Sequence, residues 1–406
     1  MGPVPCERWR WHMTGLPGVS APSAPSAASR PVAMQDLGAV EAVSEGFLPE
    51  KTAAAPEEGL PAEVPGLLGD FVGAGGKRVR PLLCLLGRQA ARGPGGAPRA
   101  IRVAASLELF HAFALFHAFA PFHTFALLHT FALLHTFALT HDDLMGHSAT
   151  RRGRPPTLQH VLAARHQAGR TPTAAARLGS APALLAGDVA LAWSAELLHT
   201  AGLTHPQLTT ALGRTGAMRT QVMDGQYLDL LSTGRPGPDT CVPWKAIRCK
   251  AAGHTFVHPL LLGTELAGAG PALTTAWAEY GWAAGEAFQL SDDLVGVFGR
   301  PDETGKPDGD DLREGKHTLL TALAHQRADP VERTALDRHL GEAGLDEQGA
   351  CRLREVLTAS GAHDAIRRTL RERCHAAVRA LEDAPLPGTV RRALTDLAAS
   401  LASRTT

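Results

Sequence analysis

The 406-residue chain has no net charge, because 40 lysines and arginines balance 40 aspartates and glutamates. A protein without an overall positive field lacks the attraction that gathers nucleic acid or anionic lipid around its surface. We therefore expect no nucleic-acid partner. Any binding of anions has to come from local clusters of basic residues.

Cysteines are also scarce: the chain has six, and no two of them are spaced as C-x-x-C. Scattered cysteines are typical of reduced thiols rather than of a disulfide framework or a zinc site. The sequence also lacks an apolar stretch of signal-peptide length after its basic start. Together these absences predict a cytoplasmic protein.

Residues 1–62 contain few large apolar side chains and are rich in Pro, Ala, Ser and Gly. Such a composition buries too little apolar surface to offset the entropy lost on ordering. We expect a disordered tail here, followed by one helical domain over residues 63–406. Two roles stay open for the tail: none at all, or docking of a partner that the sequence does not identify.

From residue 63 onward, leucines and alanines recur at spacings of three and four residues, as in LLCLLGRQAAR and LLAGDVALAWSAELL. This spacing is typical of amphipathic helices. Clusters of Gly and Pro, such as GPGGAP and STGRPGPDT, separate the segments. The sequence therefore predicts an all-α fold, a single large helical bundle.

A hexapeptide array occupies residues 111–140, and its units begin at His111, His117, His123, His129 and His135. Six residues advance a helix by about 600°, so successive histidines point in different directions and form no chelating face. We interpret the array as the in-frame duplication of one unit of a buried helix. No charged residue lies between Glu108 and Asp142, so a membrane span is an alternative, although the recurring histidines argue against it.

Two acidic pairs share one pattern: Asp142 and Asp143 in HDDLMG, and Asp292 and Asp293 in SDDLVG. Adjacent carboxylates in apolar sequence repel each other, which raises their pKa values unless a cation neutralises them. A few oxygen ligands that are shared with phosphate oxygens favour Mg²⁺. We predict that both pairs bind magnesium. The alternative is two chance pairs at solvated helix ends.

Basic residues accompany the acidic pairs, in GGKRVRP (75–81), RRGRPPT (151–157), GKPDGDDLREGK (305–316) and at Lys250. Arginine offers phosphate oxygens a forked set of donors, and lysine offers a point charge. With two magnesium-type acidic pairs, these residues predict a cavity that binds two diphosphates.

In this order and spacing, the motifs resemble those of the trans-isoprenyl diphosphate synthases, the polyprenyl synthetase family. The resemblance also includes AGD (186–188), GQYLD (225–229) and QLSDDLVGVFG leading to GDDLREGKHT. It implies an antiparallel bundle of the isoprenoid synthase type with a central cavity. Across this cavity the two acidic motifs would hold about three Mg²⁺ ions on an allylic diphosphate. It also implies a homodimer.

The resemblance further implies roles for single residues at matching positions. The metal ligands would be Asp142, Asp143, Asp292 and Asp293. The allylic diphosphate would be held by Arg151, Lys250, Lys306 and Lys316. The condensation centre would be lined by Gln226 and Asp229.

A second diphosphate site, for isopentenyl diphosphate, would comprise Lys77, Arg80, Arg152 and one histidine. His135 fits best, because it precedes Asp142 by seven residues and so lies on nearly the same helix face, two turns away.

The implied activity is a prenyl transfer. Metal and basic charge stabilise departure of the allylic diphosphate, the isopentenyl double bond attacks the allylic cation, and a proton is lost. In the resembling family, the residues four and five before the first aspartate, here Ala138 and Phe137, form the floor under the growing chain. They predict room for roughly a twenty-carbon product. We expect geranylgeranyl diphosphate, with farnesyl diphosphate as the alternative.

The sequence departs from the family pattern at the ends of both acidic motifs. The first motif ends in Gly146 instead of aspartate, the second ends in Gly296, and Ala251 replaces a usual threonine. A missing bridging carboxylate removes several kcal/mol of charge stabilisation if nothing replaces it. Two alternatives therefore stay open: a catalytically impaired paralogue that binds prenyl diphosphates or serves as a partner subunit, and a terpene cyclase.

Overall fold

The structure is a computed structural model that describes residues 36–57, 63–73, 78–92, 98–116, 172–235, 237–299, 310–342 and 344–403. Within these ranges the regular elements are all helices, so the prediction of an all-α fold is confirmed. The predicted array overlaps them only at its start, since residues 117–171 lie outside the described residues.

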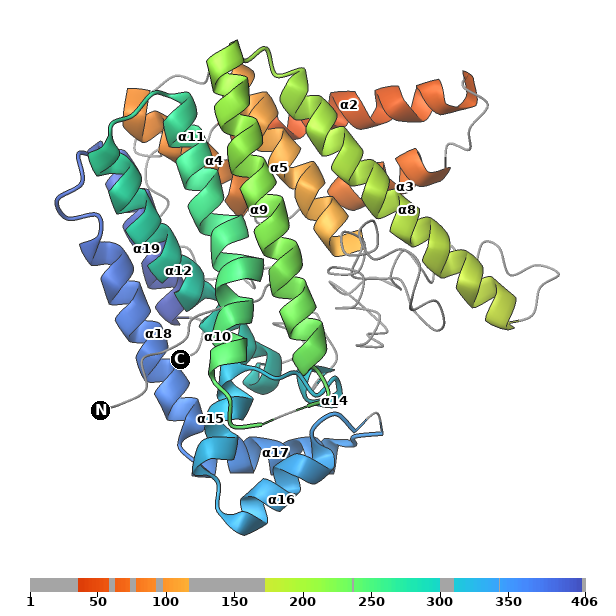
Figure 1. Cartoon of the computed structure of the whole chain (residues 1–406), viewed down its shortest axis with the longest axis vertical. Helices are drawn as coiled ribbons and strands as arrows, with labels where there is room; N and C mark the ends of the chain where they lie inside the picture. Colours follow the sequence, from red (N-terminus) through yellow and green to blue (C-terminus); the bar gives the residue numbers. More distant parts are fainter. Residues whose placement is uncertain are drawn as a thin grey trace, which may run out of the picture.

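The N-terminal half is built around helices that run side by side (Figure 1). Its elements are α2 (Leu37–Glu57), α3 (Glu63–Gly73), α4 (Val79–Arg92), α5 (Pro98–Phe116), α8 (Pro172–His199) and α9 (His205–Ser232). Helix α5 packs along α8 and against α4, while α2 lies on α3 and α5.

The C-terminal half contains the long helix α12 and the shorter helices around it (Figure 1). Its elements are α10 (Cys241–Ile247), η3 (Arg248–Val257), α11 (His258–Leu266), α12 (Pro271–Phe298), α14 (Asp310–Arg313), α15 (Leu319–Arg327), α16 (Pro330–His339), α17 (Glu347–Ala359), α18 (Ala362–Arg379) and α19 (Gly388–Ser403). Helix α12 packs against η3 and α18, and α4 packs against α11, which joins the two halves.

Helix α12 forms the centre of the core because its sequence is apolar almost all round. Trp277, Tyr280 and Phe288 are buried there, and the Phe288 ring contacts that of Phe256 at 6.0 Å between centroids. Each large apolar side chain stabilises the fold by about 1.5–3 kcal/mol when it leaves water. A helix that is buried on all sides can hold charged residues at its end in a fixed position.

The element η3 is a π-helix, inserted without a break between α10 and α11. It is closely flanked by glycines of both neighbouring helices. A Cβ at Gly225 of α9 would lie 2.5 Å from the backbone nitrogen of Lys250, and one at Gly285 of α12 would lie 2.5 Å from the Cβ of Ala252. These glycines let η3 approach α9 and α12 closely. π-Helical turns are frequent at functional sites.

Helix α2 contradicts part of the predicted disordered tail. Residues 37–57 are helical, and they bury Val40, Phe47 and Leu48. Phe47 meets the ring of Trp193 on α8. The prediction is wrong for these residues because a few apolar side chains suffice when an existing helical surface covers them. Residues 1–35 lie outside the described residues.

A membrane span was an alternative for the array. In the part of the chain that the structure describes, no helix combines the length and the hydropathy needed to cross a membrane. Most of the array lies outside that part.

Candidate active site

The second acidic motif lies on the last two turns of α12. Asp293 is buried and accepts a hydrogen bond from Gln289 Nε2 at 2.5 Å, whereas Asp292 is half-buried. Gln289 lies one helical turn before Asp293, so a neutral amide donor holds this carboxylate in place. Both predicted ligands of the motif thus lie at one end of the buried central helix.

Asp311 occupies the space that the last residue of this motif leaves empty. A Cβ added at Gly296 would lie 2.1 Å from Asp311 Oδ2, so a side chain cannot fit there while Asp311 keeps its position. Asp311 is buried and comes from the short helix α14. The sequence does not single it out, although an acidic pair (310–311) five residues before Lys316 was a visible signal.

Lys316 is bound by two carboxylates. Its Nζ lies 2.5 Å from Asp311 Oδ1 and 2.7 Å from Glu314, and its side chain is 3% exposed. Gly315 precedes it with a positive φ of 62°, a conformation that glycine adopts without strain. Its carbonyl accepts a hydrogen bond from the Gly234 amide, which ties this loop to the end of α9.

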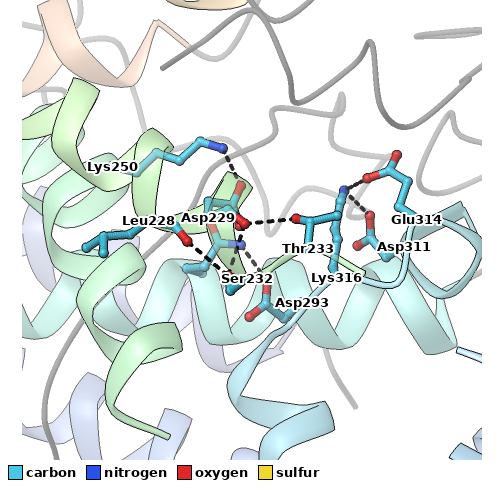
Figure 2. A network of polar contacts seen from close by, with 10 residues as sticks. Leu228, Asp229, Ser232, Thr233, Lys250, Asp293, Asp311, Glu314 and Lys316 are labelled. Carbon is cyan, nitrogen blue, oxygen red and sulfur yellow. Dashed lines mark hydrogen bonds and ion pairs between the residues drawn. The ribbon is translucent and has the colours of Figure 1, made fainter. Parts of the chain in front are cut away.

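A buried ion pair joins α9 to η3 near these residues. Lys250 Nζ donates to Asp229 Oδ2 at 3.0 Å, and both side chains are less than a tenth exposed. Figure 2 shows this pair in one view with Asp293 and Lys316. The structure therefore brings together predicted residues from α9, η3, α12 and the loop after α14, which are far apart in the sequence.

Gln226 lies one turn before Asp229 and is completely buried. Neither its Oε1 nor its Nε2 has a hydrogen-bond partner among the described residues. Leaving a buried polar group unpaired costs about 1–3 kcal/mol. The amide is thus available for a ligand at the position that the resemblance implies.

Arg80 lies elsewhere in the core, on α4, where it contacts η3. Its Nε donates to His254 Nε2 at 3.1 Å, and both side chains are almost fully buried. Its two terminal nitrogens are buried as well, and neither has a hydrogen-bond partner among the described residues. Burial lowers the pKa of Arg80 to about 10, although the charge of Glu108 opposes this shift.

His254 is neutral in this environment. Burial first, and then the charges of Arg80 and His258, lower the pKa of its ring well below 6.5, while a hydrogen bond to the Lys250 backbone opposes the shift. A neutral imidazole has one acceptor nitrogen, which suits a bond from a guanidinium. The sequence does not single out His254, although its position four residues after Lys250 was visible.

His111, the first histidine of the array, lies beside this pair. Its ring is 5.9 Å from that of His254 between centroids, and it is buried at 9% exposure on α5. His135, which the sequence favours for the isopentenyl diphosphate site, lies outside the described residues. The structure thus places a different copy of the same unit next to His254, which binds Arg80.

The remaining predicted site residues lie outside the described residues, and so does Gly146. They are Lys77, His135, Asp142, Asp143, Arg151, Arg152 and Lys306. Within the described ranges, no three His, Cys, Asp or Glu side chains are arranged to hold a metal ion. The magnesium site predicted for the two acidic pairs therefore stays a prediction.

A model of the polyprenyl synthetase family matches residues 121–356 of the chain. The chain belongs to the polyprenyl synthetase family. This confirms the family to which the motifs point, and with it a prenyltransferase.

Among characterised relatives, the chain is 31% identical to the geranylfarnesyl diphosphate synthase of Aeropyrum pernix over 261 residues, which cover 64% of this chain and 69% of the relative. It is 32% identical to the geranylgeranyl diphosphate synthase of Mycobacterium tuberculosis over 246 residues, which cover 60% and 64% of the two chains. These similarities support a short-chain prenyltransferase, and they lend no support to an impaired paralogue.

Among solved structures, the chain is similar to a geranylgeranyl pyrophosphate synthase of Corynebacterium glutamicum, crystallised with isoprenyl diphosphate and magnesium. The two share 33% identity with a TM-score of 0.80, over 90% of this chain and 98% of the neighbour. The polyprenyl synthetase fold therefore extends well beyond the segment that the family model matches.

Proposed function

We propose that this polyprenyl synthetase condenses isopentenyl diphosphate with an allylic prenyl diphosphate, and that its product is geranylgeranyl diphosphate. One observation carries the proposal: four chain segments bring Lys250, Asp229, Asp293 and Lys316 together at one end of α12 (Figure 2). Lysines and carboxylates that meet in a buried setting suit a diphosphate with its counterions. The Corynebacterium glutamicum neighbour, with isoprenyl diphosphate and magnesium, agrees with it.

The residues present fit a magnesium site. Asp292 and Asp293 offer carboxylate oxygens, while Asp311 lies in the space beside Gly296, where it is bound to Lys316. Asp142 and Asp143 would complete the ligand set for about three ions. When bound, Mg²⁺ supplies the Lewis-acid charge that lets the allylic diphosphate leave.

The chain's own residues then divide the work. Lys250 and Lys316 neutralise the departing allylic diphosphate, helped by Arg151 and Lys306. Asp229 holds the Lys250 ammonium at 3.0 Å and keeps it oriented. The free amide of Gln226 bonds a polar group of the substrate. Positioning and fixed charge thus lower the barrier, without a covalent intermediate on the enzyme.

We assign the second diphosphate to the Arg80–His254 pair, about one helical turn along η3 from Lys250. Arg80 offers two unpaired nitrogens to isopentenyl diphosphate, and Lys77 and Arg152 add charge. His111 is the histidine that we assign to this site in place of His135, because it lies next to the Arg80–His254 pair. The proton lost after condensation passes to the departed diphosphate.

Three further features belong to the proposal. The product has twenty carbons, as roughly predicted from the floor residues Phe137 and Ala138. The enzyme is a homodimer, as the resemblance implies. It works in the cytoplasm.

A test uses purified protein, Mg²⁺, labelled isopentenyl diphosphate and farnesyl diphosphate. Extension of the farnesyl chain is the expected result. Silence, with prenyl diphosphate still bound, would favour the impaired paralogue. Release of diphosphate without incorporation of label would favour a terpene cyclase.

A further inference from the structure

We propose that His254 is a positioning residue for isopentenyl diphosphate: it fixes the Arg80 guanidinium through Nε, so that both terminal nitrogens stay free for the diphosphate. The inference rests on the proposed function, because Arg80 binds this substrate only if the chain is a synthase. It adds to that function a residue that neither the motifs nor the resemblance single out.

The geometry of the contact supports a positioning role. Arg80 Nε and His254 Nε2 are 3.1 Å apart, in a part of the core where Arg80 is 1% and His254 2% exposed. The His254 ring is held by Phe110, which meets it edge-on at 5.1 Å between centroids, and by His111 at 5.9 Å. The acceptor nitrogen thus has a fixed place, and Nε is the only guanidinium nitrogen that it binds.

The unpaired ends of Arg80 point to a ligand. A fully buried guanidinium with two unpaired nitrogens is costly unless an anion neutralises it. The acidic neighbour Glu108 attracts Arg80 only through its charge, and its carboxylate is bound to Arg78 at 2.9 Å. An Arg held at Nε presents its two terminal nitrogens as a fork, which matches two oxygens of one phosphate group. A diphosphate is the ligand that this fork fits.

The neutral state of His254 is needed for this role, since a protonated ring would donate from both nitrogens and repel the guanidinium. Burial is the largest cause that lowers the pKa of the ring. The charges of Arg80 from α4 and of His258 further along its own helical run lower the pKa of the ring as well, and a hydrogen bond to the Lys250 backbone opposes them. The rings of Phe110 and His111 from α5 also face it.

The π-helix η3 links this contact to the allylic site. Lys250 and His254 both belong to η3, four residues apart, and bind Asp229 and Arg80 respectively. One rigid element therefore sets the positions of the cations for both diphosphates. A histidine that only packed in the core would explain neither its bond to Arg80 nor the two terminal nitrogens of Arg80 that have no partner among the described residues.

Three substitutions at position 254 separate positioning from packing. His254→Phe keeps a ring but has no acceptor for Arg80. His254→Asn has an acceptor on a shorter side chain that does not reach Arg80, whereas His254→Gln has one at a similar reach to the histidine. We expect the KM for isopentenyl diphosphate to rise about tenfold in the Phe and Asn variants, because a hydrogen bond to a charged group is lost. The KM for farnesyl diphosphate should change less than about twofold, and the Gln variant should recover most of the affinity. His325→Phe, at a buried histidine of α15 that lies 3.7 Å from Asp337, is the matched control and should leave both KM values near those of the wild type.

Calorimetric titration with isopentenyl diphosphate alone gives a readout that does not depend on turnover, and thermal unfolding reports whether each variant is folded. If wild-type protein neither binds isopentenyl diphosphate nor extends a chain, the proposed function fails. If the wild type does both, and folded Asn or Phe variants bind isopentenyl diphosphate as tightly as the wild type, the role of His254 is wrong. Equal losses for both substrates, or in the Gln variant, would likewise overturn it in favour of a packing role.

Discussion

The carboxylate of Asp311 lies where a side chain at Gly296 would have to be, because a Cβ there would come within 2.1 Å of Asp311 Oδ2. The last position of the second acidic motif is Gly296, which has no carboxylate. The carboxylate of Asp311, from α14, lies beside that position in the folded chain. Lys316 holds Asp311 by its other oxygen at 2.5 Å. The glycine thus opens the position for an acid from α14.

Gly296→Ala should therefore impair the enzyme, although alanine favours helices. The methyl group has to displace Asp311 from its bond with Lys316, and such overpacking costs about 1–3 kcal/mol. We expect a higher Mg²⁺ concentration for half-maximal activity and a lower kcat. Gly216→Ala on α9, where an added Cβ meets nothing within 4 Å, is the matched control. Equal magnesium titrations for both variants would contradict the role of Asp311.

Gly146→Asp tests whether the missing carboxylate in the first acidic motif limits activity. This prediction rests on the sequence, because Gly146 lies outside the described residues. A restored carboxylate should add a bridge between metals and raise kcat, by about tenfold for each 1.4 kcal/mol gained. Steady-state kinetics at saturating Mg²⁺ measure this effect. An unchanged kcat would show that the motif does not suffer from the missing acid.

Breaking the Asp229–Lys250 pair should cost both stability and turnover. Lys250→Met or Asp229→Asn removes the partner 3.0 Å from a buried charge, and breaking a buried pair destabilises by about 3–5 kcal/mol. The double variant should be more stable than the sum of the two single losses implies, because no uncompensated charge remains. Denaturant unfolding of the four proteins gives the coupling. Additive losses would mean that the 3.0 Å contact is not a working ion pair.

The unfolding free energy should fall as the pH drops below neutrality. Burial lowers the pKa of His258 to about 4, and burial also lowers that of His254. In the unfolded chain both regain ordinary values near 6.5, so between pH 6.5 and about 4 the unfolded state binds more protons. Stability is therefore complete above the unfolded pKa and lost as the pH falls through this window. His258 alone should account for about 2 kcal/mol between pH 7 and pH 5.

Urea unfolding of the wild type and of His258→Phe at pH 7, 6 and 5 measures this dependence. The variant should show a smaller loss, because one buried neutral histidine is missing. The same slope in both proteins would mean that His258 does not lose its low pKa on unfolding.

Periodicity and motif order predict the helical fold and the residues around Lys250 and Asp293, because helix-forming patterns and fixed spacings are local properties of a sequence. The same patterns do not predict helix α2, because it is ordered through contacts with Trp193 and other residues of helices distant in the sequence. Tertiary contacts of this kind leave no periodic signal in a segment rich in Pro and Ala.

The parts of the site that sequence patterns miss depend on proximity in space. Asp311 belongs to the site because its carboxylate lies in the space beside Gly296. His254 belongs to it because η3 places its ring within hydrogen-bond distance of Arg80. Repeats pose a related problem: similar units offer several histidines, and only the fold shows that His111 lies beside His254. Spacing from Asp142 favours His135, which lies outside the described residues.

Mass spectrometry of the reaction products tests the central claim most directly. Wild-type protein with Mg²⁺, isopentenyl diphosphate and farnesyl diphosphate should form a twenty-carbon prenyl diphosphate, as roughly expected from the pocket floor. The product should vanish with a chelator and in the Asp292→Asn/Asp293→Asn double variant. A wild-type reaction without any extended prenyl chain, or a double variant that extends the chain as well as the wild type, would contradict the account.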